Sequence, residues 1–176
     1  MADLPGTVNA PPQTATPLPP EGEPADEFTM LRAWMRYLRA SALRKIEGLS
    51  PEQLRWRPAP GGNSAGGIVQ HLGYAERWWF RIVFAGQDLP LNFKEDGRAF
   101  VLAPDATAAS VGDFYKRESE LADQAIDGAS LDEWSRTALG RRSTLRWILT
   151  HMVEETARHA GHLDITRELI DGQRGR

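Results

Sequence analysis

The chain has 176 residues, of which 41% are hydrophobic and 26% are charged, and its formal net charge is −3. This length and apolar fraction are typical of one folded domain and exclude a wholly disordered chain. There are four histidines and no cysteine, which excludes a disulfide framework, a cysteine-type zinc site and a protein thiol nucleophile. The apolar stretches are far shorter than the roughly 20 residues that span a bilayer.

The first 25 residues differ from the rest of the chain. Residues 1–25 hold seven of the twelve prolines and three acidic residues, but no lysine or arginine. They lack the apolar run of a signal peptide, so we expect a disordered or extended tail, either passive or able to dock on a neighbouring subunit. The domain that follows, residues 26–176, is then neutral overall. A neutral domain without a basic block argues against nucleic acid or a membrane surface as a partner, and we expect a cytoplasmic protein.

Four segments of this domain repeat apolar residues every three or four positions, which predicts amphipathic helices. These segments are residues 28–46, 68–82, 111–126 and 145–170. A glycine follows each of them, as is common at helix ends, and we expect Asn63 or Ser64 to cap the second. Regions rich in proline, glycine or polar residues separate the helices. The pattern predicts an all-α four-helix bundle with long crossover connections.

Two of the predicted helices carry further expectations. Gly161 lies inside the last helix at a cost of about 1 kcal/mol relative to alanine, which predicts a close backbone contact or a local bend there. On the third helix, the residues expected to face the core are Val111, Phe114, Leu121, Ala125 and Ile126.

All four histidines lie on two of these helices, His71 on the second and the others on the last. Glu155 and His159 are four residues apart and therefore share one helix face, which is otherwise apolar. A buried carboxylate needs a partner or a proton, because an unpaired buried charge costs several kcal/mol. With His71 from a facing helix, two imidazoles and one carboxylate form a set that suits zinc and leaves one position open. The same set also suits nickel, cobalt, manganese or iron(II).

Other interpretations of this pattern stay open. An ExxxH spacing is common on helices by chance, and a core histidine is often purely structural. Glu155 can instead pair with an arginine, for instance Arg158 or Arg77. His151, one turn before Glu155, can replace His71 as a ligand or form a hydrogen bond to the carboxylate.

Two segments resemble the DinB-like (YfiT-like) metalloenzyme superfamily. Residues 70–76, QHLGYAE, resemble its HLxxxE segment, and residues 151–162, HMVEETARHAGH, resemble its last-helix motif. The resemblance covers about residues 26–172. Within the superfamily, the chain most resembles an actinobacterial branch whose members keep the pattern ETxRHAGHxDxxRE. It implies a four-helix bundle that holds a divalent metal through His71, Glu155 and His159.

The resemblance also suggests a chemistry. Glu155 stands where many members of the superfamily have histidine, and in this the chain is similar to the mycothiol-dependent maleylpyruvate isomerases. Related families use low-molecular-weight thiols such as mycothiol or bacillithiol, and a chain without cysteine fits an external thiol. The implied function is a thiol-dependent S-transferase or isomerase that acts on a small electrophile, such as an epoxide, a halide or an activated alkene.

Four further residues are candidates for roles around the metal. His162 and His151 lie near enough on the last helix to accept protons or form hydrogen bonds beside it, although His162 replaces a glutamine found in many members. Arg158 and Arg77 can recognise a carboxylate on a cofactor or substrate, or belong to a solvated face.

Three tryptophans, Trp34, Trp78 and Trp79, are candidates to line a pocket or to fill the core. Two other functions use the same residues. One is a hydrolase with metal-activated water, and the other is a non-enzymatic, metal-stabilised bundle, for instance a homodimer, that binds a small molecule or a partner.

Overall fold

The computed structural model describes residues 26–90, 97–137 and 142–174. The predicted tail, residues 1–25, lies outside them. The helices are α1 (Glu27–Arg44), α2 (Pro51–Arg55), α3 (Ala65–Glu76), the π-helix η1 (Arg77–Phe84), α4 (Ala108–Ala125) and α5 (Leu145–Asp171). Over the described ranges, the only pairing of extended backbone is an isolated bridge between Trp134 and Thr144. The prediction of an all-α fold is confirmed.

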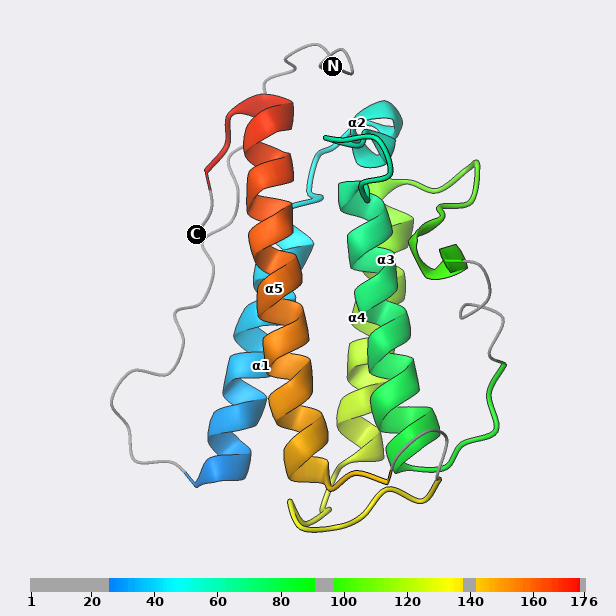
Figure 1. The fold of residues 1–176 in the computed structure, drawn as a ribbon, viewed down its shortest axis with the longest axis vertical. Coiled ribbons are helices and arrows are strands. Elements are labelled where there is room, and N and C mark those ends of the chain that lie inside the picture. Colours follow the sequence, from blue (N-terminus) through cyan, green and yellow to red (C-terminus); the bar gives the residue numbers. More distant parts are fainter. Residues whose placement is uncertain (1–25, 91–96, 138–141, 175–176) are drawn as a thin grey trace.

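The long helices pack lengthwise as a bundle, with α1 beside α5 and α3 beside α4 (Figure 1). In Figure 1, α3 and α4 run in the same direction, so the connection between η1 and α4 crosses the length of the bundle, as predicted. α4 ends, and α5 begins, at the same end of the bundle. Within the described part of the chain, no helix is long and apolar enough to span a membrane.

Side-chain caps fix where the α-helices begin. Each starts after a residue whose side chain accepts a hydrogen bond from the backbone N–H three positions later, which satisfies one of the unpaired N–H groups of the first turn. These residues are Asp26, Ser50, Ser64, Thr107 and Thr144. The expected cap at Ser64 is confirmed. The cap at Ser50 begins α2, where the sequence analysis placed only a loop.

The helix that contains His71 changes its winding at Arg77. There α3 continues into η1 without a break, and the N–H of Ala85 donates to the carbonyl of Phe80, five residues earlier, at 3.0 Å. Five-residue hydrogen bonds make a wider turn than the four-residue bonds of an α-helix, and such segments are frequent at functional sites. Gly86, with φ of 70°, ends η1 at the expected position.

The inner face of α4 matches the prediction only in part, since Val111 and Ile126 are buried as expected. Half-buried Phe114, Leu121 and Ala125 lie at its edges. The buried residues are Val111, Gly112, Tyr115, Glu118, Ser119 and Ala122. The face is rotated because Glu118 is held inside by two arginines of η1. Arg77 donates to both of its carboxylate oxygens at 2.7 and 3.1 Å, and Arg81 donates to Oε2 at 2.7 Å.

A second buried ion pair ties α3 to α1. Arg39 donates from Nε and Nη2 to the two carboxylate oxygens of Glu76, both at 2.8 Å, and from Nη1 to Asp123 of α4 at 2.9 Å. Glu76 is fully buried and ends the HLxxxE segment. This segment therefore combines His71 with a structural carboxylate that fixes α3 against its neighbours.

Gly161 lies on the outer face of α5. It is exposed, and a Cβ atom built there would meet no other group within 4 Å. α5 runs unbroken from Leu145 to Asp171. The expected close backbone contact at this glycine is therefore wrong, because the residue faces away from the rest of the bundle.

Candidate metal site

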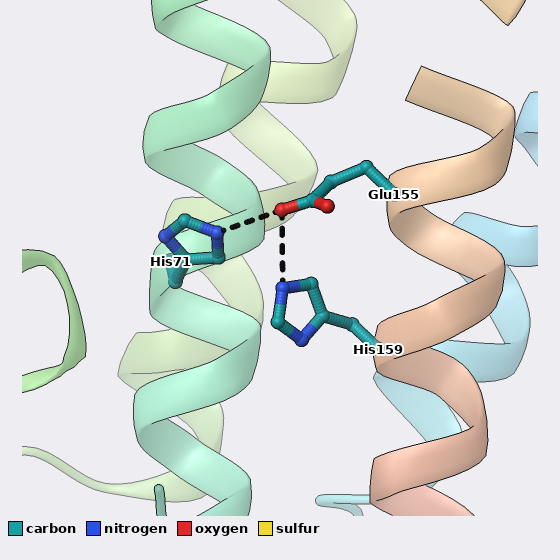
Figure 2. A group of neighbouring side chains, drawn as sticks. All are labelled: His71, Glu155 and His159. Carbon is teal, nitrogen blue, oxygen red and sulfur yellow. Dashed lines mark hydrogen bonds and ion pairs between the residues drawn. The ribbon is translucent and has the colours of Figure 1, made fainter. Parts of the chain in front are cut away.

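Three side chains from α3 and α5 meet in the middle of the bundle (Figure 2). The Nε2 atoms of His71 and His159 each lie 3.1 Å from the same oxygen, Oε1 of Glu155. His71 projects from α3, and Glu155 and His159 project from successive turns of α5. The three side chains are 22%, 19% and 11% exposed, so the group is largely buried but within reach of solvent.

This group has the geometry of a metal site. One ligand atom from each of His71, Glu155 and His159 lies within 4.8 Å of the other two. Tetrahedral coordination with bonds of about 2.0–2.1 Å places ligand atoms roughly 3.3 Å apart, close to the 3.1 Å between each histidine nitrogen and Oε1 of Glu155. Two nitrogen donors and one oxygen donor also suit a zinc-type ion with one open position. The residues therefore fit a divalent metal.

The protonation states of Glu155 and His159 also favour metal binding. Burial acts to raise the pKa of Glu155, but the hydrogen bonds and charges of His71 and His159 outweigh it and hold this pKa below its ordinary value. Burial lowers the pKa of His159, against the opposing effect of Glu155. At neutral pH the carboxylate is thus ionised and the His159 imidazole is neutral, which are the forms that bind metal ions.

A loop segment that the sequence analysis did not single out covers one face of His71. The ring of Phe100 stacks on the imidazole, with centroids 4.1 Å apart and planes 16° apart. Gln70 of α3 holds the segment through bonds from Nε2 to the carbonyls of Ala99 and Val101, both at 3.0 Å. At Gly67, a Cβ atom would lie 2.5 Å from the carbonyl oxygen of Phe100. The loop therefore sits directly on the α3 backbone.

A cavity of about 350 Å³ opens beside the metal-ligand group. Its described lining is largely apolar and aromatic, and includes His71 and Glu155 at one end. The other lining residues are Tyr74, Ala75, Trp78, Trp79, Gly97, Ala99 and Phe100. Trp78 and Trp79 are consecutive in η1, and the wide π-turn brings both to the same cavity. The candidate ligands thus face a space in which a small molecule can bind.

Comparison with known families gives this geometry a context. A family model described as mycothiol S-transferase matches residues 30–172, most of the chain. The chain belongs to the mycothiol S-transferase family. No curated protein matches it. The match agrees with the resemblance to DinB-like proteins seen in the sequence.

In this mycothiol S-transferase family member, the two remaining histidines lie on either side of the metal-ligand group. The His162 ring is 5.8 Å from that of His159, is exposed, and lines a different cavity from the aromatic one. His151 stacks on Trp147 at 5.0 Å and meets the edge of Trp79 at 4.9 Å. His151 is therefore packed among tryptophans, and the structure brings His71, not His151, to Glu155.

The two arginines considered for carboxylate recognition have partners within the chain. Arg77 binds Glu118, and Arg158 forms an ion pair with Glu154 on the exposed face of α5. Neither lines the cavity. Trp34 does not line it either, and packs edge-on against Tyr37 of α1. Of the three tryptophans proposed for a pocket, Trp78 and Trp79 are thus found there.

Two residues of the site were missed in the sequence. Tyr74 is three positions after His71, so its place on the same helix face could have been read from the spacing. Phe100 carries no such signal, because it reaches the site from an irregular loop.

Proposed function

We propose that this chain is a metal-dependent S-transferase that joins the sulfur of an external thiol, such as mycothiol, to a small electrophile. Family membership supports the thiol, and one observation supports the metal: His71, Glu155 and His159 converge on one point at the edge of an open cavity. The chain contains no cysteine, so the reacting sulfur has to come from outside.

The residues divide the work of such a reaction. His71, Glu155 and His159 would hold a divalent ion, with zinc as the first candidate, and such an ion would supply the positive charge that lowers the pKa of an incoming thiol. Ionised Glu155 and neutral His159 supply two of the donors and His71 the third, while the stacked Phe100 ring limits how far the His71 imidazole can turn. The cavity then orients the electrophile beside the sulfur. Holding the electrophile next to the sulfur raises the reaction rate through proximity. The thiol proton is released to solvent.

Metal binding is tested first by analysis of the purified protein and by zinc titration of variants. We expect His71→Ala, Glu155→Ala and His159→Ala each to lower zinc affinity more than about tenfold, since even residues that only support ligands cost that much. Glu154→Ala is a matched control, because Glu154 is the adjacent carboxylate on the same helix and is exposed. Equal losses for Glu154→Ala and Glu155→Ala would contradict the assignment.

His151→Ala tests the alternative ligand that the sequence left open. Because His151 packs between Trp147 and Trp79 and not against Glu155, we expect zinc affinity to stay within about twofold of the wild type. If His151→Ala abolished binding while His71→Ala retained it, the ligand set proposed here would be wrong.

Thiol dependence separates the proposed function from its two rivals. With zinc and mycothiol present, we expect an electrophile with a chromogenic leaving group to be converted, and the rate to vanish without either component. Turnover that needs zinc but no thiol would instead show a hydrolase that uses activated water. Zinc binding without turnover in any arm would favour a metal-stabilised binding protein.

A further inference from the structure

The cavity beside the metal-ligand group has a distinctive wall. Tyr74, Trp78, Trp79 and Phe100 supply its aromatic surface, and Ala75 and Ala99 add small apolar contacts. Flat aromatic faces pack best against flat apolar groups. The wall is therefore shaped for a planar, apolar molecule.

The second feature of this wall is its charge, which bears on the kind of substrate that can bind. Among its described residues, the one ionised group is the carboxylate of Glu155, and no lysine or arginine takes part. Arg77 does not line the cavity: it lies over the Tyr74 ring, 5.5 Å from its centroid, and is bound by Glu118. Arg98 lines a neighbouring cavity instead. The described wall therefore offers no cationic side chain to a carboxylate that enters, and the charge of a divalent ion would be offset by Glu155 and a bound thiolate. Without such a partner, the loss of water from the carboxylate costs several kcal/mol.

From these two features we propose that the cavity selects flat, uncharged aromatic electrophiles and rejects those that carry a carboxylate. This inference rests on the proposed S-transferase function and names the substrate class of the same site. It also departs from the sequence expectation that an arginine recognises a substrate carboxylate.

An arylmethyl halide illustrates the reaction. The thiol sulfur forms a bond to the benzylic carbon, the carbon–chlorine bond breaks, and chloride leaves with the electron pair. The thiol proton passes to the buffer, so the products are a thioether, chloride and a proton. Benzyl chloride and 4-(chloromethyl)benzoate undergo this same step and differ in one carboxylate, which makes them a matched pair.

The first test compares kcat/KM for the two halides, each divided by its rate with the free thiol in solution. For the wild type we expect a preference for benzyl chloride of at least about tenfold, the factor that corresponds to a 1.4 kcal/mol penalty. Ala99→Arg puts a cation into the wall on a half-buried loop residue, and we expect it to reduce the preference at least fivefold. A wild-type ratio near one would overturn the proposal.

Three control variants isolate charge and position. Ala99→Gln adds bulk without charge, and Ala103→Arg adds the same cation on the exposed part of this loop outside the cavity. Arg98→Ala removes the nearest exposed arginine. All three should keep the wild-type ratio within about twofold. If Ala99→Gln or Ala103→Arg changed the ratio as much as Ala99→Arg, a cation in the wall would not be the cause.

A binding experiment separates failure of this inference from failure of the proposed function. Nitrobenzene and 4-nitrobenzoate do not react, and both quench tryptophan fluorescence. We expect nitrobenzene to bind more tightly to chelator-treated and zinc-loaded protein alike, with Trp78→Phe and Trp79→Phe each losing part of the quenching. Equal binding of the two probes together with thiol-dependent turnover would overturn the inference alone. A nitrobenzene preference without turnover would overturn the proposed function alone.

Discussion

Replacing Glu76 by leucine tests how the buried ion pair holds α3. The change removes both oxygens that Arg39 binds at 2.8 Å and leaves a buried guanidinium whose remaining acid is Asp123, a side chain that is 30% exposed. Breaking a buried pair by removing one partner costs about 3–5 kcal/mol. Because Asp123 stays, we expect a loss near the lower limit, about 3 kcal/mol of unfolding free energy. For a domain of this size that lowers Tm by roughly 6–12 °C.

Urea unfolding followed by tryptophan fluorescence measures this loss, and a double-mutant cycle tests its cause. In the double variant Arg39→Met/Glu76→Leu no fully buried charge is stranded, and Asp123, which loses its arginine, is 30% exposed and can be solvated. Most of the stability should therefore return, to within about 1 kcal/mol of the wild type. The reasoning would be refuted if Glu76→Leu cost less than about 1 kcal/mol, or if the double variant were as unstable as the single one. Asp123→Asn, which weakens only the exposed arm, should cost about 1 kcal/mol or less.

Three further changes test other parts of the structure. Arg77 and Arg81 oppose the effect of burial and hold the pKa of Glu118 below its ordinary 4.5, so this carboxylate stabilises the fold fully above that pH. The stability advantage of the wild type over Glu118→Gln should therefore shrink as pH falls below 4.5 in acid titrations of unfolding. Gly161→Ala should raise stability by up to about 1 kcal/mol, since the position is helical and open; a loss in thermal melts would mean that another group contacts this face. Gly67→Ala should lower the unfolding free energy by about 1–3 kcal/mol, because the added Cβ pushes on a backbone carbonyl. It should also weaken zinc binding by displacing Phe100. A variant with unchanged stability and zinc affinity would show that the loop does not contact α3 here.

The sequence predicted the features that depend on periodic spacing. The four long helical segments, the Ser64 cap and the shared face of Glu155 and His159 all follow from residues three or four apart, which a helix brings together. His71 came from the same reasoning about a facing helix, supported by the family resemblance. These features are local, or depend on how one helix face meets another.

What escaped prediction depends on tertiary partners. From the sequence alone, Glu118 is expected to face solvent. In the structure two arginines of η1 surround it, and their contacts rotate the inner face of α4. The helix α2 was visible in principle, because Ser50 and Gln53 form a reciprocal capping box, but five residues carry too little periodicity to stand out. Phe100 reaches the site through the tertiary path of a loop, for which no spacing rule exists.

The π-helix η1 has a consequence for how this scaffold can change. Its turns hold more residues than α-turns, so deleting one residue within 77–84 would let the segment revert to an ordinary α-helix. His71 precedes the segment and the other two candidate ligands lie on α5, so all three would keep their places. Within the segment, side chains would move to new positions around the helix axis, because an α-turn advances each residue by about 100° and the wider π-turn by less. Insertions and deletions in η1 can therefore remodel the aromatic wall while the ligand set is inherited intact.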